Sequence, residues 1–167
     1  MPKTAAKRLY IMNKKIKLEK ADWANAEEIL SMQQSAFAPL LKKYKDYATN
    51  PAAENLERVR ERLTYTNTDT FLIVAENTRV GCIRIAYDNE VCTLKQILIL
   101  PTFQGNGYAQ SAIALAESMY SQKVWRLDTI KQEVKLCHLY EKLGYKRTYK
   151  EQKVSEIMTL VFYQKIK

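Results

Sequence analysis

The sequence has only one histidine and three cysteines in 167 residues, and no two cysteines form a CxxC pair. Zinc sites are built from clusters of these two residue types, so we expect no metal. Cys82, Cys92 and Cys137 give no disulfide framework. This pattern favours free thiols in a reducing compartment, and hence a cytoplasmic protein.

Long apolar runs are also missing. No stretch approaches the roughly 18 residues that cross a membrane, and the N-terminus lacks the apolar segment of a secretory signal. Apolar residues make up 47% and charged residues 27%, the balance of a soluble globular protein. We expect one domain over residues 16–167, preceded by a basic tail or short first element over residues 1–15.

Acidic residues are too few to balance the basic ones, and the net charge is +9. The first twenty residues hold seven Lys or Arg against one Glu, which is +6. The rest holds twenty against seventeen, which is +3. Because most of the excess lies in a tail rather than on a folded face, a nucleic-acid-binding protein is the disfavoured alternative.

Hydrophobic periodicity predicts an α/β fold on a mostly antiparallel central sheet. Asp22 is expected to cap a helix over 23–37 that Pro39 interrupts, and Asn50 and Pro51 are expected to start a second. Turns are expected at 77–78 and 88–89, which would place Cys82 opposite Lys95 and Cys92 opposite Ile85, so that the two thiols stay apart. Strands are expected at 16–20, 70–76, 80–87, 91–100, 124–130, 145–151 and 156–165, with later helices at 108–119 and 136–143.

Glycine is scarce as well: there are four, and two of them, Gly105 and Gly107, lie between a strand and a helix. A helix N-terminus with bare backbone before it can bind an anion. A tight turn with no ligand is the alternative. The P-loop pattern ending in Gly-Lys-Ser/Thr is absent, and the third glycine of the dinucleotide pattern is replaced by Ser111 or Ala112.

Two motifs carry a family resemblance. The stretch ILILPTFQGNGYAQ resembles the pyrophosphate-binding motif of the GNAT superfamily, the Gcn5-related N-acetyltransferases, with Gln104 opening the motif and Gly107 and Ala109 closing it. CHLYEKLGYKR is similar to a second family signature. The resemblance extends over roughly residues 16–163, including the order of elements, and looks like a bacterial subgroup of small members.

The resemblance implies acetyl-CoA, or another acyl-CoA, as cosubstrate. The strands 94–100 and 125–130 would splay apart, and pantetheine would fill the gap. Lys142 and Lys131 would meet the 3′-phosphate. Glu133 stands where many relatives have an asparagine that helps to hold the cofactor. The remaining implied cofactor contacts are Ile97, Leu98 and Ile99 in the strand, and Gln104, Gly105, Asn106, Gly107, Tyr108 and Ala109 in the turn.

The same resemblance places Tyr140 at the position of the general acid, although its place on an apolar helix stripe also fits a core residue. The glutamate that some relatives carry early in the fourth strand falls at Thr93, which cannot serve as a base. Asp128 is the candidate base, with Glu133, Glu90 and Glu54 as weaker ones, and each also fits a solvated surface carboxylate. His138 should point away from the Tyr140 hydroxyl and is expected to be structural, and Cys137 is expected to be a buried thiol.

We therefore expect an N-acyltransferase that passes acetyl from acetyl-CoA to a primary amine by direct attack in a ternary complex. The acceptor, a small-molecule or peptide amine, should contact the first two helices and their loop, where Phe37, Tyr44 and Tyr47 could line a pocket. A catalytically silent module that binds or senses acyl-CoA is the alternative. Many relatives dimerise, so a homodimer is a further expectation from the resemblance.

Overall fold

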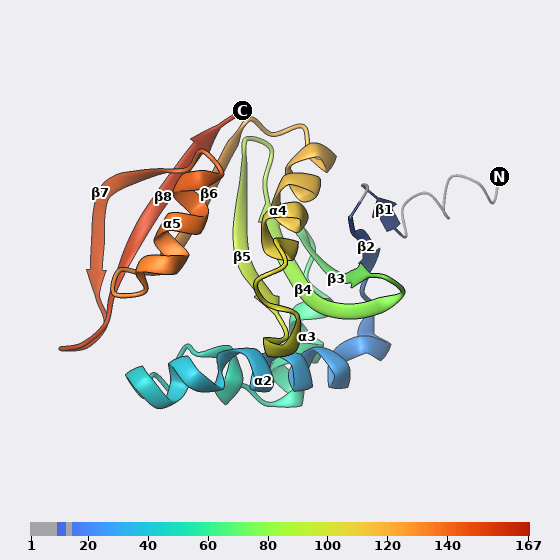
Figure 1. Cartoon of the computed structure of the whole chain (residues 1–167), viewed down its shortest axis with the longest axis horizontal. Coiled ribbons are helices and arrows are strands. Elements are labelled where there is room, and N and C mark those ends of the chain that lie inside the picture. The colour runs from blue at the N-terminus through green and yellow to red at the C-terminus, as the bar shows by residue number, and fades with distance from the viewer. Residues whose placement is uncertain (1–9, 13–14) are drawn as a thin grey trace.

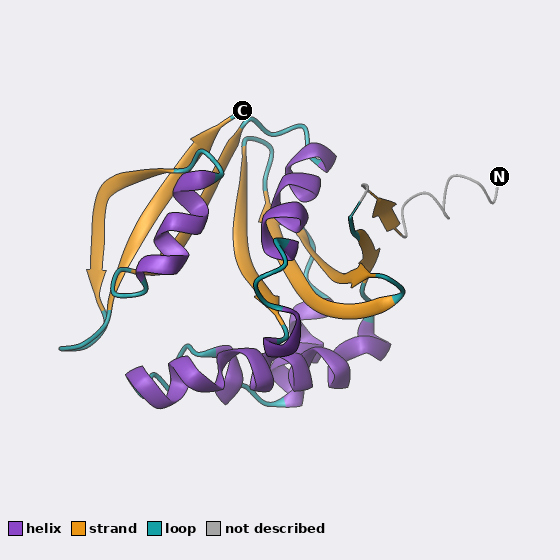
Figure 2. Cartoon of the chain, viewed as in Figure 1, coloured by secondary structure: helices purple, strands orange, loops and turns teal. Residues whose placement is uncertain are grey.

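The computed structural model describes residues 10–12 and 15–167, and it arranges them as helices packed on both faces of one sheet (Figures 1 and 2). The sheet has the order β1-β2-β3-β4-β5-β6-β8-β7, and every neighbouring pair except β5 and β6 is antiparallel. This confirms the expected fold class. None of the helices in the described part of the chain has both the length and the hydropathy needed to cross a membrane.

The elements follow the expected order along the chain. The strands are β1 Tyr10–Met12, β2 Lys17–Lys20, β3 Thr68–Ala75, β4 Thr78–Tyr87, β5 Val91–Ile99, β6 Val124–Ile130, β7 Lys146–Lys153 and β8 Thr159–Ile166. The α-helices are α2 Ala26–Tyr44, α3 Leu56–Leu63, α4 Tyr108–Met119 and α5 Val134–Lys142. Three single-turn 3₁₀ helices, at Trp23–Asn25, Pro51–Ala53 and Pro101–Phe103, connect them.

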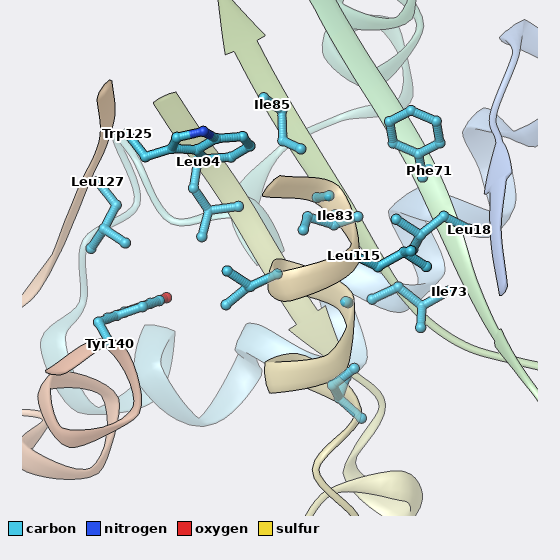
Figure 3. Packing of buried hydrophobic residues seen from close by; sticks show 14 of the residues in the cluster. Leu18, Phe71, Ile73, Ile83, Ile85, Leu94, Leu115, Trp125, Leu127 and Tyr140 are labelled. Atoms are coloured by element: carbon cyan, nitrogen blue, oxygen red, sulfur yellow. The ribbon is translucent and has the colours of Figure 1, made fainter. Parts of the chain in front are cut away.

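Two apolar clusters hold the layers together. On one face, α2 and α3 pack against Leu72, Cys82 and Leu98 of the sheet. On the other face, α4 and α5 cover a larger cluster of buried side chains, which includes Leu18, Ile83 and Trp125 (Figure 3). Alternate residues along a strand point to opposite faces, and β3, β4 and β5 contribute side chains to both clusters, which fixes their register.

The sheet is interrupted between β5 and β6. These parallel strands pair only where Val91–Thr93 meets Val124–Arg126, and beyond that point they diverge, as Figure 1 shows. The expected splay is confirmed. One edge of β5 is therefore left without a neighbouring strand over its second half, and backbone donors and acceptors at such an edge need a partner.

The first helix differs from the expectation. Asp22 caps the 3₁₀ turn at Trp23–Asn25, and α2 then continues through Pro39 to Tyr44 instead of stopping. Proline removes one helical hydrogen bond, but the residues beyond it are held by tertiary contacts, with Tyr44 only 6% exposed. Asn50 caps the 3₁₀ turn at Pro51–Ala53, and α3 has its own cap at Asn55.

Both hairpin turns are shifted by one residue. Glu76 and Asn77 form the first, with φ of 50° and 62°, because a two-residue turn with left-handed backbone matches the twist of the strands. In the second, the Asp88 carboxylate accepts hydrogen bonds from the N–H groups of Glu90 and Val91, both at 2.8 Å.

A register shift after Arg84 adds to the change in the second hairpin. Cys82 therefore pairs with Leu98 instead of the expected Lys95, and Cys92 pairs with Tyr87 instead of Ile85. Cys82 and Cys92 are therefore apart, as predicted, although the register differs from the expected one. All three cysteines are free and buried.

Candidate active site

The glycine turn leads from the end of β5 into α4. Gly105 and Gly107 have φ of +83° and +75°, values that side chains disfavour, which explains two glycines one residue apart. The side chain of Gln104 donates to the carbonyl of Ile99 at 2.9 Å, and the amide of Asn106 donates to the carbonyl of Phe103 at 3.0 Å. These bonds tie the turn to the strand before it.

The turn leaves its main-chain donors open. The first hydrogen bond of α4 runs from the N–H of Ser111 to the carbonyl of Gly107 at 3.1 Å. No acceptor among residues 10–12 and 15–167 takes up the N–H groups of residues 105–110. Together with the positive end of the helix dipole, these donors form a site suited to phosphate.

A groove of about 470 Å³ runs between this turn and α5. Its α5 wall is built from Lys135, His138, Leu139 and Lys142. Two lysines and an exposed histidine therefore face the open N–H groups, and such a wall suits a ligand that carries several phosphates. Lys142 was predicted from the sequence, whereas Lys131 instead pairs with Glu151 at 2.9 Å on β7.

His138 lies on a different side of α5 from Tyr140, as expected, and it is exposed and lines the groove. Lys135 was missed altogether. The spacing of Lys135, His138 and Lys142 at i, i+3 and i+7 would have revealed a basic stripe on one helix face.

Tyr140 lies on the opposite, buried side of α5. It is 6% exposed, and Figure 3 shows its ring reaching from α5 toward α4 and β5, with the hydroxyl leading. Among the described residues nothing hydrogen-bonds this hydroxyl. Burial, and to a smaller extent the charge of Asp128, raises the pKa of Tyr140 above its ordinary value. The phenol therefore stays protonated at neutral pH and can donate.

The open edge of β5 presents alternate peptide groups. The carbonyl of Leu98 faces β4, since a Cβ on Gly81 would lie 2.0 Å from it, and the N–H of Leu100 bonds Val80 of β4 at 2.8 Å. Because peptide groups alternate along a strand, those of Ile97 and Ile99 point into the splay. Of the three residues predicted here, two face the gap and Leu98 does not.

The candidate bases separate by location. Asp128 is exposed on β6, one of the two splayed strands, between buried Leu127 and Thr129. Glu54 is held by both guanidinium nitrogens of Arg62, at 2.5 and 2.8 Å. Glu90 lies in the exposed turn between β4 and β5, and Thr93 lies where β5 still pairs with β6. Of these candidates, only Asp128 is a carboxylate on one of the two splayed strands.

Glu133 precedes α5 and is already engaged. The same carboxylate oxygen accepts a hydrogen bond from Lys43 Nζ at 2.7 Å and from the Tyr44 hydroxyl at 2.6 Å. These donors, Lys43 before Tyr44, hold the pKa of Glu133 below its usual range. Of the aromatic residues expected at the acceptor side, Tyr44 is buried here, Phe37 on α2 packs against the cluster between this helix and the sheet, and Tyr47 is 69% exposed.

Comparisons with known proteins show a family match and several similar structures. A family model described as the acetyltransferase (GNAT) family matches residues 28–145. No curated protein sequence matches the chain. Among solved structures, RimL, a ribosomal L7/L12 alpha-N-protein acetyltransferase in complex with coenzyme A, is similar with a TM-score of 0.74 at 13% identity, covering 94% of this chain and 97% of that one.

Two further structures are similar over nearly their whole length. The microcin C7 self-immunity acetyltransferase MccE, in complex with acetyl-CoA and AMP, has a TM-score of 0.70 at 16% identity and covers 93% of this chain and 94% of that one. Spermidine N-acetyltransferase from Vibrio cholerae, in complex with CoA and spermine, has a TM-score of 0.73 at 15% identity, with 92% and 96% covered.

Proposed function

This chain belongs to the acetyltransferase (GNAT) family, and from that membership we infer that it catalyses acetyl-CoA-dependent N-acetylation of an amine. The observation that carries this function is the joining of a splayed sheet, an open glycine turn and a protonated tyrosine in one place. Acetyl-CoA, when bound, supplies an activated acetyl group and a thiolate leaving group.

The residues present fit this cosubstrate. The N–H groups of the turn and the wall of Lys135, His138 and Lys142 suit its phosphates, with the groove of about 470 Å³ between them. The peptide groups of Ile97 and Ile99 would pair with the amides of pantetheine as a neighbouring strand does. We assign the cofactor contacts of the turn to residues 104–109, as the sequence predicts.

Tyr140 is assigned as the general acid. A phenol with a pKa of about 10 that protonates a thiolate with a pKa of about 8.5 works uphill by about 2 kcal/mol. Burial raises the pKa of Tyr140 further, but a thiolate in the same dry gap is also made more basic. Tyr140 therefore acts best as a hydrogen-bond donor that gives up its proton as the thiolate departs.

Asp128 is assigned as the base. An alkylammonium has a pKa of about 10.4, so freeing its lone pair at pH 7 costs about 4–5 kcal/mol. Asp128 lies exposed on β6, where it can accept that proton directly or through water. The amine would then attack in a ternary complex, with the N–H of Ile99 directed into the splay to stabilise the developing oxyanion.

The acceptor is proposed to be a small-molecule or peptide amine. The names of two similar structures give a ribosomal protein and spermidine as acceptors. One is a peptide amine and the other is a small-molecule amine. Free, buried thiols support action in the cytoplasm. A homodimer stays a prediction from the resemblance, and size-exclusion chromatography with light scattering checks it.

The test is direct. Incubation with acetyl-CoA and a panel of amines should release free CoA, measured with a thiol reagent. Tyr140→Phe should reduce kcat at least tenfold while CoA binding persists, because the ring remains and only the donor is lost. Unchanged turnover would remove Tyr140 from the mechanism. Tight CoA binding without turnover over a broad panel would instead favour the silent, acyl-CoA-sensing alternative.

A further inference from the structure

Glu133 holds an ammonium group that the chain itself supplies. The Nζ of Lys43 lies 2.7 Å from the carboxylate and 5.1 Å from the centroid of the Tyr44 ring. A carboxylate beside an aromatic face is a built site for an alkylammonium, because the charge and the ring quadrupole both attract the cation. The Tyr44 hydroxyl, bonded to the same carboxylate at 2.6 Å, fixes the geometry of the site.

The fixed and the removable parts of this site are different residues. Tyr44 is buried, and the side chain of Glu133 is 22% exposed, whereas that of Lys43 is 56% exposed. An ion pair to such an exposed lysine is weak, since water and salt compete for both partners. Lys43 can therefore leave while the carboxylate and the ring remain in place.

The site lies where an acceptor would approach. It joins the C-terminal end of α2 to the start of α5 (Figure 1). Glu133 precedes Tyr140 by seven residues, which corresponds to about 10 Å along the helix axis. An extended chain of several carbons could thus place one amine near Tyr140 and a second cation at Glu133.

We propose that Glu133 and Tyr44 form a subsite for a second ammonium group of the acceptor, and that Lys43 occupies this subsite when the acceptor is absent. The proposal rests on the proposed function and narrows its acceptor class to linear amines with two cationic ends, such as a diamine. Lys43 is then an intramolecular competitor of the substrate rather than part of a structural ion pair.

Substitutions of the two partners of the ion pair should change the preference for a diamine over a monoamine in opposite directions. The measured quantity is the ratio of kcat/KM for 1,6-diaminohexane to that for hexylamine, so general damage to folding or catalysis cancels. Lys43→Met should raise this ratio about two- to fivefold, because a weak competitor is removed. Glu133→Gln should lower the ratio at least fivefold, whatever its effect on hexylamine alone. Lys43→Arg keeps the cation and should match wild type.

A ratio that moves in the same direction in Lys43→Met and Glu133→Gln, or in neither, overturns the subsite. Should Glu133→Gln not fold, Tyr44→Phe tests the same carboxylate, since loss of the phenol bond should also lower the ratio. The proposed function fails separately, through absence of CoA release by wild type over the whole amine panel. Acetylation of other amines but of neither of these two overturns the subsite alone. Hexylamine turnover with unchanged ratios overturns the subsite alone.

Discussion

Gly81 is the position at which a single methyl group should do most damage to the cosubstrate edge of the sheet. A Cβ at this residue of β4 would lie 2.0 Å from the carbonyl oxygen of Leu98, 3.0 Å from its carbon and 3.1 Å from Cα of Ile99. Ordinary contacts are about 3.5 Å or longer. All three obstructing atoms belong to backbone, so β5 must move by more than about 1 Å.

The cost of Gly81→Ala can be worked from that displacement. One or two ladder hydrogen bonds are lost, at about 1 kcal/mol each, and the buried side chains of Leu98 and Ile99 must repack, for about 1–2 kcal/mol more. The sum is about 2–4 kcal/mol, or a fall in melting temperature of about 4–16 °C for a chain of this size. Because the moved peptides include Ile99, kcat/KM for acetyl-CoA should also fall about tenfold or more.

Gly105→Ala is the matched control. A Cβ there meets nothing within 4 Å, so only the strain of its positive φ remains, for about 1 kcal/mol and a fall of about 2–4 °C. Thermal unfolding followed by circular dichroism compares the two variants. A Gly81→Ala protein with a melting temperature within about 1–2 °C of wild type would refute the close approach of β4 and β5.

Three further predictions concern ionisable side chains that are buried or paired. No hydrogen bond or ion pair within the described residues engages the guanidinium of Arg84, and burial lowers its pKa to about 10; Arg84→Met should therefore raise the free energy of unfolding by about 1–3 kcal/mol, and a lower melting temperature would contradict this. Burial raises the pKa of Cys82 to about 12 and that of Cys92 to about 11, so a thiol reagent at pH 8 should leave native protein unmodified and find three thiols after unfolding. The pKa of Glu133 is depressed in the folded state, so its contribution to stability is present above its unfolded pKa of about 4.5 and is lost as pH falls below that value. The stability difference between wild type and Glu133→Gln should accordingly shrink from pH 6 to pH 3, and a difference that grows would contradict the pairing with α2.

The sequence was sufficient for the elements whose local signals agree with their packing. The apolar segments of β3, β4 and β5 and the glycines before α4 each act through nearest neighbours, so they predicted the strands and the glycine turn correctly. The splay of β5 and β6 could be expected only from the family resemblance, since no residue pattern marks where two parallel strands part.

The errors arose where distant contacts decide the outcome. Pro39 signals a helix end locally, but the burial of Tyr44 and its bond to Glu133 extend α2 past it. The register of Cys82 depends on an irregularity after Arg84 that no turn residue announces. The ammonium site at Glu133 joins residues 89 and 90 positions apart, a separation that periodicity within one helix cannot reveal.

Titration with coenzyme A tests the central claim most directly. If the open N–H groups of the glycine turn and the basic wall of α5 hold its phosphates, calorimetry should show binding. At a concentration 100 times Kd, coenzyme A should then stabilise the fold by about 2.7 kcal/mol, which raises the melting temperature by about 5–11 °C. No binding heat and an unchanged melting temperature at millimolar coenzyme A would contradict the account.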